Sequence, residues 1–291
     1  MSDLKVVIAS GKGGTGKTTL AVSLALAIHQ NGVLVRLLDC DVEAPNAHIS
    51  LKPKISVRRE AVIQMPLIDP QHCTQCKTCV EVCRYHALFM GGTGPVLLPQ
   101  LCHGCGSCTL QCPSGAITEG PHTIGTLQAG FSAAGFSFAG GELTISEPMA
   151  TPVIRQLKQW QNQAEGVTVL DAPPGASCPV VETLRGADFA ILVTEPTPFG
   201  LHDLKQMVQV VRQMALPHAV IVNRSIPDSD IIEQYCAEEH IPIWMKVPFS
   251  KEIAARLAAG EPLLNILPAM QESLWQLFNR IETVIVENGT R

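Results

Sequence analysis

Eight cysteines within residues 73–112 constrain the fold of this 291-residue chain more than any other feature. They form two quartets, each with the spacing C-x2-C-x2-C-x3-C. The first quartet is Cys73, Cys76, Cys79 and Cys83, and the second is Cys102, Cys105, Cys108 and Cys112. In a reducing compartment, such spacing favours metal binding over disulfide formation. The segment is therefore expected to fold around bound metal.

The two quartets belong to an internal repeat. Residues 72–90 can be laid over residues 101–119 with a shift of 29 positions, and each copy offers one quartet. The spacing is that of two-cluster bacterial ferredoxins, in which the fourth cysteine of each run ligates the cluster of the other half. One [4Fe–4S] cluster is therefore expected on Cys73, Cys76, Cys79 and Cys112, and the other on Cys102, Cys105, Cys108 and Cys83. Zinc is the alternative, but zinc sites do not normally repeat three cysteines at two-residue gaps.

The two halves differ after the fourth cysteine. Cys112 is followed by Pro113, as the motif expects, whereas Cys83 is followed by Arg84. A positive charge next to a cluster tends to raise its reduction potential. Arg84 therefore suggests that the two halves are not equivalent.

A glycine-rich loop near the N-terminus indicates a nucleotide site. Residues 4–9 form a short apolar run typical of a buried strand, and residues 18–30 have apolar residues at helical spacing. Strand, loop and helix in this order are the context of a phosphate-binding loop. Lys17 would reach the β- and γ-phosphates of ATP, and the Thr18 hydroxyl would ligate Mg²⁺. The nucleotide-binding residues expected here are Gly11, Gly13, Gly14, Thr15, Gly16, Lys17, Thr18 and Thr19.

Polar residues follow three further apolar runs. Residues 33–38 lead into Asp39 and Asp41, residues 167–170 into Asp171, and residues 219–222 into Asn223. An acidic residue at a strand end is often only a helix cap. Several such residues at successive strand ends instead indicate the edge where open α/β sheets bind ligands.

The motifs together resemble those of a known family. Lys12-Gly-Gly-Thr-Gly-Lys17-Thr resembles the deviant Walker A loop of the group that includes MinD, Mrp and the nitrogenase iron protein. Further matches are Asp39-Cys-Asp41-Val-Glu-Ala-Pro-Asn46, Asp171-Ala-Pro-Pro-Gly175 and Thr194-Glu-Pro-Thr-Pro-Phe-Gly200. With both cysteine quartets, nearly the whole chain resembles MinD-superfamily P-loop ATPases that contain an inserted ferredoxin domain.

The resemblance implies an architecture. It implies a doubly wound, mostly parallel α/β sheet with helices on both faces. Residues 1–63 and 121–291 would form the ATPase domain, and residues 64–120 an inserted α+β ferredoxin-like domain with two [4Fe–4S] clusters. It also implies a homodimer that forms with ATP.

The resemblance also implies roles for single residues. Lys12 would cross the dimer interface to the nucleotide of the partner. Asp41, in the first switch, would orient or activate the attacking water, with Asp39 supporting the Mg²⁺ shell. In the second switch, Asp171 would hold Mg²⁺ through water and Gly175 would place an N–H near the γ-phosphate. The base would be recognised at Asn223 and covered by the segment that contains Pro248.

Composition and charge exclude several classes of protein. The apolar fraction of 46% is typical of a globular chain with a substantial core. A net charge of −5, with scattered Lys and Arg, disfavours a nucleic-acid binder. No apolar run reaches the roughly 18 residues of a membrane span, and the first residues lack the regions of a signal peptide. A cytoplasmic location is therefore expected.

Three cysteines and the C-terminal segment remain. Cys40 and Cys236 are expected to pack as small apolar residues, whereas Cys178 directly follows the second switch and could face its counterpart in a dimer. Residues 269–286 are expected to form a helix that packs on the core, because their polar face is too acidic for a membrane-targeting tail.

The leading functional hypothesis is an ATPase, slow without its partner, that couples nucleotide state to electron transfer or to iron–sulfur or metallocofactor assembly. Its partner would be a redox or metallocofactor-containing protein. The cysteine segment lies between the switches at Asp41 and Asp171, so ATP binding could reposition it. One alternative is a ferredoxin-type electron carrier whose P-loop is only a regulatory sensor. Another is a MinD-like positioning protein, against which the ligand cysteines and the acidic tail argue.

Overall fold

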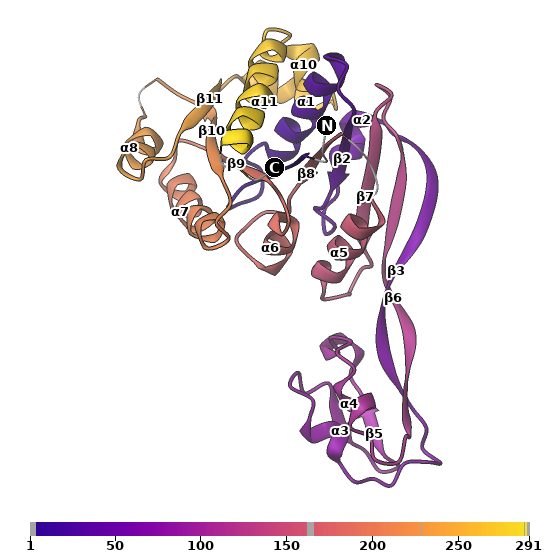
Figure 1. Ribbon diagram of the computed structural model, residues 1–291. Coiled ribbons are helices and arrows are strands. Elements are labelled where there is room, and N and C mark those ends of the chain that lie inside the picture. Colours follow the sequence, from indigo (N-terminus) through magenta and orange to yellow (C-terminus); the bar gives the residue numbers. More distant parts are fainter. Residues whose placement is uncertain (1–3, 162–165, 228, 288, 290–291) are drawn as a thin grey trace.

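The computed structural model describes residues 4–161, 166–227, 229–287 and 289 (Figure 1). The described chain forms one large sheet of nine strands, in the order β11-β10-β9-β1-β8-β2-β7-β6-β3. Seven of these strands are parallel to one another. They are β1 (Leu4–Ala9), β2 (Val35–Asp39), β7 (Ser137–Leu143), β8 (Val167–Asp171), β9 (Phe189–Thr194), β10 (His218–Ser225) and β11 (Ile243–Pro248). The predicted doubly wound, mostly parallel sheet is thus confirmed.

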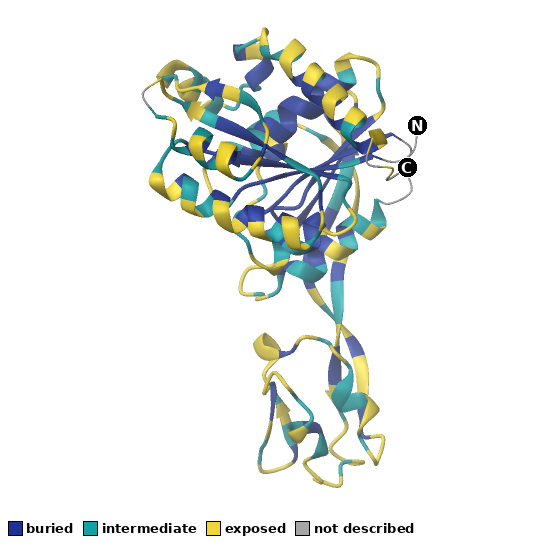
Figure 2. Cartoon of the chain, turned by 60° about the vertical axis from the view of Figure 1, so that its left-hand side comes forward, coloured by how far each residue is buried: buried dark blue, intermediate teal, exposed yellow. Residues whose placement is uncertain are grey.

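Helices cover both faces of the sheet, because its central strands are apolar on both sides. In β1, Val6 and Ile8 belong to one core, whereas Val7 and Ala9 belong to the other. The first core packs against α1 (Lys17–Gln30), α2 (Ala47–Leu51), α10 (Leu263–Ile266) and α11 (Met270–Glu287). The second packs against α5 (Ala150–Trp160), α6 (Cys178–Leu184), α7 (Pro198–Gln213) and α8 (Ile231–Glu238). Figure 2 shows the sheet as the buried centre of this body.

The C-terminal helix α11 packs on the core, as the sequence predicts. One stripe of it is buried beside α1: Leu274, Leu277, Phe278, Ile281 and Ile285. Within the described residues, no helix combines the length and the apolar character needed to cross a membrane.

Two long antiparallel strands complete the sheet and leave it. They are β3 (Lys54–Ile68) and β6 (Ile117–Phe131), which pair with each other along their whole length. β6 pairs with β7 only from Gly125 to Phe131, so its first residues extend beyond the sheet. The free part of the pair, called the ribbon from here on, projects away from the body (Figure 1). Its register shifts between Ala61 and Val62, which marks a β-bulge where the ribbon leaves the sheet.

The ribbon carries a small lobe, residues 69–116, which contains the cysteines. Its elements are α3 (Thr78–Glu81), β4 (Leu88–Met90), β5 (Pro95–Leu97), the 3₁₀ helix η1 (Pro99–Leu101) and α4 (Ser107–Leu110). The expected domain limits at residues 64 and 120 fall inside continuous strands, because β3 runs on to Ile68 and β6 starts at Ile117. Most of the lobe surface is exposed or half-buried (Figure 2).

The backbone of the lobe preserves the 29-residue repeat. Helices α3 and α4 are equivalent under this shift. Residues with positive φ also occur at equivalent positions. Gln75 and Gly104, and likewise Lys77 and Gly106, lie before these helices, whereas His86 and Gly115 lie after them. The repeat inferred from the cysteines is therefore also a repeat of backbone conformation.

Candidate functional site: a nucleotide pocket and two cysteine cavities

The glycine-rich loop lies where the central parallel strands end. It follows β1 directly and leads into α1, with positive φ at Gly14 and Gly16. A Cβ atom on Gly16 would lie 2.3 Å from Asn223 Nδ2. The Asn223 amide in turn donates a hydrogen bond of 2.7 Å to the Thr15 carbonyl. The end of β10 is therefore held against the loop, and only glycine fits between them.

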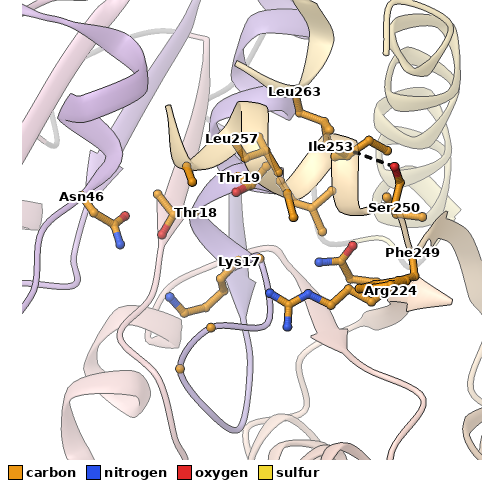
Figure 3. A pocket seen from close by; sticks show the side chains of 18 of the residues that line it. Lys17, Thr18, Thr19, Asn46, Arg224, Phe249, Ser250, Ile253, Leu257 and Leu263 are labelled. Carbon is orange, nitrogen blue, oxygen red and sulfur yellow. Dashed lines mark hydrogen bonds between the residues drawn. The ribbon is translucent and has the colours of Figure 1, made fainter. Parts of the chain in front are cut away.

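A cavity of about 380 Å³ opens over this loop (Figure 3). Its volume lies in the range of small-ligand sites. The polar part of its wall contains Gly13, Gly14, Gly16, Lys17, Thr18, Thr19, Asp41, Asn46, Asn223 and Arg224. The apolar part comes from the end of β11, from α9 (Lys251–Ala258) and from α10, and includes Pro248, Phe249, Ile253, Leu257 and Leu263. A polar loop facing an apolar wall suits a molecule with phosphates at one end and a flat base at the other.

Two carboxylates, a threonine hydroxyl and a lysine meet beside the loop. Lys17 Nζ lies 3.5 Å from Asp171 Oδ1 and 3.7 Å from Asp41 Oδ2. Thr18 Oγ1 donates a hydrogen bond of 2.5 Å to Asp171 Oδ2. Burial raises the pKa of Asp171 and of Asp41, although the Lys17 charge opposes the rise. The buried Asp171 Oδ1 has no hydrogen-bond partner among the described residues and faces the Lys17 ammonium at 3.5 Å, so it is an oxygen that could also ligate a metal cation.

Asp39 binds the loop that follows it. Its carboxylate accepts hydrogen bonds from the N–H groups of Asp41, Asn46 and Ala47, at 3.0–3.3 Å. Burial and the neighbouring charge of Asp171 raise the pKa of Asp39 to about 8. In this structure, Asp39 thus positions the loop that carries Asp41.

Other predicted residues lie close to the pocket without lining it. Gly11 is packed against α7, where a Cβ atom would lie 2.5 Å from Asp203 Cβ. Thr15 is buried, and its hydroxyl has no hydrogen-bond partner within the described chain. Gly175 has a φ of 94°, and its N–H donates to the Ser10 carbonyl at 3.0 Å. An approach of the Gly175 N–H to a phosphate would require this bond to open.

Lys12 is held within its own chain. Its Nζ lies 3.1 Å from Glu195 Oε2, while Arg224 Nη1 donates to Glu195 Oε1 at 2.6 Å. The Glu195 side chain is 9% exposed, so its charge is balanced by these two cations. Sequence reasoning quoted Glu195 only as part of a motif and missed this contact. A role for Lys12 on a partner subunit would require it to leave Glu195.

The eight quartet cysteines line two small cavities in the lobe. The first is lined by Cys73, Cys76, Cys79 and Cys112, and the second by Cys83, Cys102, Cys105 and Cys108. Each cavity therefore takes its fourth cysteine from the other half of the repeat. Among the described residues, no group of three or more His, Cys, Asp or Glu side chains is arranged to hold a metal ion.

Polar groups contact the cysteine sulfurs, and apolar residues surround them. The Thr78 hydroxyl lies 3.3 Å from Cys76 Sγ, and the Ala87 N–H donates to Cys83 Sγ at 3.3 Å. Ala87, Leu88, Ala116 and Ile117 are buried beside the cavities. Such contacts and shielding are the features that tune a metal–thiolate site.

Of the three remaining cysteines, two are buried as expected and the third is exposed. Cys40 and Cys236 are buried, and burial raises the pKa of Cys236 to about 11. Cys178 is exposed at the first position of α6.

This fold and this site define a P-loop nucleotide-binding protein. The chain belongs to the family described as the CobQ/CobB/MinD/ParA nucleotide binding domain, whose model matches residues 6–263. Among solved structures, the septum site-determining protein MinD of Pyrococcus horikoshii, complexed with Mg-ADP, is similar in fold, with a TM-score of 0.58. The two share 17% identity, and the match covers 97% of this chain and 98% of that one.

Two relatives are similar in sequence. An uncharacterised protein of Methanocaldococcus jannaschii is 29% identical over 270 residues, which cover 91% of this chain and 93% of the relative. A protein of Pyrococcus horikoshii named as an iron–sulfur cluster carrier is 24% identical over 223 residues. That match covers 75% of this chain and 60% of the carrier.

Proposed function

We propose that this protein is an ATPase that couples its nucleotide state to electron transfer, or to iron–sulfur or metallocofactor assembly, on a partner protein. The observation that carries the proposal is the sorting of eight cysteines into two four-cysteine cavities at the end of a ribbon. The ribbon is formed by β3 and β6, which belong to the same sheet as β1, the strand that leads into the glycine-rich loop. One chain thus joins a phosphate site to two sets of thiolate donors.

The donor sets fit two [4Fe–4S] clusters. Four thiolates are the ligands that such a cluster needs, and bacterial ferredoxins exchange their fourth cysteines in this way. A four-iron cubane is a body several ångströms wide, so its thiolates need to surround a cavity and need not converge on one point. The clusters would supply one-electron transfer, or be the cargo. The Thr78 hydroxyl and the Ala87 N–H would stabilise the charge on Cys76 and Cys83.

The nucleotide site fits ATP with Mg²⁺. Lys17 would neutralise charge on the β- and γ-phosphates, and the Thr18 hydroxyl with the Asp171 carboxylate would hold the cation. One N–H of the Asn223 amide serves the Thr15 carbonyl, so the base could be recognised by the amide oxygen as acceptor and by the second N–H as donor. Asp41 would position the attacking water. Hydrolysis by a homodimer that forms with ATP, with Lys12 acting on the partner's nucleotide, is part of the proposal.

The relatives support the choice of partner chemistry. The carrier named for iron–sulfur clusters is 24% identical to this chain over 223 residues. Assembly or reduction of a metallocofactor is therefore favoured over an unrelated cargo. Free thiolates at this density require a reducing compartment, so the proposal includes the cytoplasm.

The test compares the reduction potentials of both clusters in the ADP-bound and ATP-bound protein. Asp41→Asn should bind ATP without hydrolysing it, so it should keep the ATP-bound potential and retain a partner from anaerobic extract. Glu43→Gln, an exposed neighbour in the same loop, is the matched control and should behave as wild type. Identical potentials and identical partner retention with both nucleotides would contradict coupling.

A further inference from the structure

Helix α5 lies between α6 and the ribbon strands (Figure 1). Val153, Ile154 and Leu157 bury one side of it in the core. Its polar residues Arg155, Gln156 and Lys158 do not point freely into solvent, since each bonds to another element. These bonds connect α5 to the ribbon on one side and to α6 on the other.

The first connection is at the point where the ribbon leaves the sheet. Gln156 Oε1 accepts from the Val62 N–H at 3.1 Å, and Gln156 Nε2 donates to the Val62 carbonyl at 2.9 Å. Val62 pairs with Thr123 directly after the register shift, at which Ile124 of β6 is the extra residue. The Gln156 amide therefore binds both main-chain polar groups of Val62 at the level of the bulge. One side chain of α5 thereby fixes the base of the ribbon.

The other strand of the ribbon, β6, also lies close to α5 at this level. Gly125 of β6 pairs with Ala61 of β3, and it is the first residue of β6 that also pairs with β7. A Cβ atom on Gly125 would lie 2.6 Å from the Glu142 carbonyl and 3.2 Å from a Val153 methyl group. Movement of α5 would therefore press on both strands of the ribbon at one level.

The second connection is with α6. Arg155 Nε and Nη2 donate to the two carboxylate oxygens of Glu182, at 3.2 and 3.1 Å. Lys158 Nζ donates to the carbonyls of Glu182, Thr183 and Arg185, at 2.6–2.9 Å. Paired charge-assisted bonds are strong and directional, and Glu182 is buried, so parting the helices is costly. α5 and α6 should therefore move together.

Helix α6 continues directly from the second switch. It begins at Cys178, three residues after Gly175. The Gly175 N–H is bound to Ser10 at the start of the glycine-rich loop. If nucleotide binding breaks the hydrogen bond between Gly175 and Ser10, the backbone at Gly175 moves and shifts the N-terminus of α6.

Space for the resulting motion exists between α5 and the lobe. A cavity of about 490 Å³ separates them. Its walls include Arg155 and Gln156 on one side and His103, Cys105 and Leu110 on the other. Cys105 and His103 also line the second cysteine cavity. The lobe thus faces α5 across a gap at the side of that proposed cluster.

We propose that α5 is the mechanical link by which the nucleotide site controls the position of the cysteine lobe, with Arg155 and Gln156 as its positioning residues. Arg155 joins it to the second switch through α6, and Gln156 joins it to the base of the ribbon. This inference rests on the proposed function, and it names the route of coupling within it.

The test uses the cluster-loaded full chain and measures two quantities. Substitution of a residue with a merely structural role would leave both unchanged. The two quantities are the difference in cluster reduction potential between ADP and a non-hydrolysable ATP analogue, and the nucleotide-dependent hydrogen exchange of residues 69–116. Gln156→Met removes both bonds to Val62 at similar side-chain volume. Gln159→Met, an exposed change on the same helix, is the control. The nucleotide-dependent differences should be lost in Gln156→Met and kept in Gln159→Met, with unchanged basal hydrolysis in both.

A second variant breaks the side-chain pair of the other connection without leaving a buried charge, while the Lys158 bonds to the α6 carbonyls remain. Arg155→Met with Glu182→Met removes the pair together, which proteins often tolerate, and it should reduce the differences. If wild type responds to nucleotide and both variants respond equally, the α5 link is wrong but the proposed function stands. If wild type shows no difference at all, coupling itself fails and the link fails with it.

Discussion

At the nucleotide site, close contacts between atoms determine which residue can occupy a position. Gly16 combines a φ of 91° with a space too small for a methyl group, because the Asn223 amide stands over it. The amide is held there by the Thr15 carbonyl. The loop conformation and the position of the end of β10 are therefore determined by one another.

Substitution Gly16→Ala should abolish nucleotide binding. The new Cβ would displace Asn223 and force a strained backbone, since alanine rarely adopts positive φ. Binding of a fluorescent ATP analogue should fall at least tenfold, whereas iron content, which depends on the distant lobe, should be unchanged. Gly32→Ala, also at positive φ but with open space around its Cβ, is the control and should bind normally. Normal affinity in Gly16→Ala would contradict the assigned role of this contact.

At this scale, sequence identified the residues whose role depends on their own neighbours in the chain. Lys17 and Thr18 could be assigned because a strand, a loop and a helix adjoin in sequence and dictate the geometry. Glu195 could not, since its partners Lys12 and Arg224 come from two other strand ends. Gln156 was missed for the same reason, because its hydrogen bonds go to Val62, 94 positions away.

Among the elements, the contact between α5 and α6 includes one buried carboxylate, that of Glu182. Burial disfavours the charge on Glu182, but hydrogen bonds and the charges of Arg155 and then Arg185 prevail and lower its pKa below the ordinary 4.5. A lowered pKa stabilises the folded state above that ordinary value. The stabilisation is lost as the pH falls through the folded pKa. The two helices should therefore separate more easily in acid.

Glu182→Gln should remove this acid sensitivity. At pH 7, the variant should lose about 1.5–3 kcal/mol of unfolding free energy, the usual contribution of hydrogen bonds to a charged group. Its melting temperature should approach that of wild type as the pH falls below 4.5, because wild type then loses the same interaction. Parallel melting curves across this range would exclude the assignment. Glu43→Gln, which alters an exposed carboxylate, controls for general charge effects.

Sequence predicted the parallel strands and their helices well, but not the ribbon. The apolar runs of β1, β2, β8, β9 and β10 are short and buried on both faces, so each is recognisable alone. β3 and β6 are largely exposed where they leave the sheet, and they pair across the whole lobe. No local pattern specifies such a pairing, since the contacts of these strands come from distant residues: Gln156 binds Val62, and Glu147 lies 2.8 Å from His122.

In the whole molecule, the two halves of the lobe depend on each other. Each cysteine cavity takes three thiols from one repeat and one from the other. The lobe has only small buried clusters of its own around these cysteines. Loss of a cluster should therefore loosen the lobe while leaving the nucleotide body folded, because the large cores lie elsewhere.

Pairs of cysteine substitutions can test the exchange directly. Cys83→Ala should lower bound iron and acid-labile sulfide to about half, because one of two clusters loses a ligand. Adding Cys102→Ala should lower them no further, since both residues line one cavity. Adding Cys79→Ala instead should remove the remaining cluster, since Cys79 lines the other cavity. If each quartet held its own cluster, the two double variants would exchange these outcomes. Cys178→Ala, exposed and far from the lobe in sequence, should leave iron content and ATP binding unchanged.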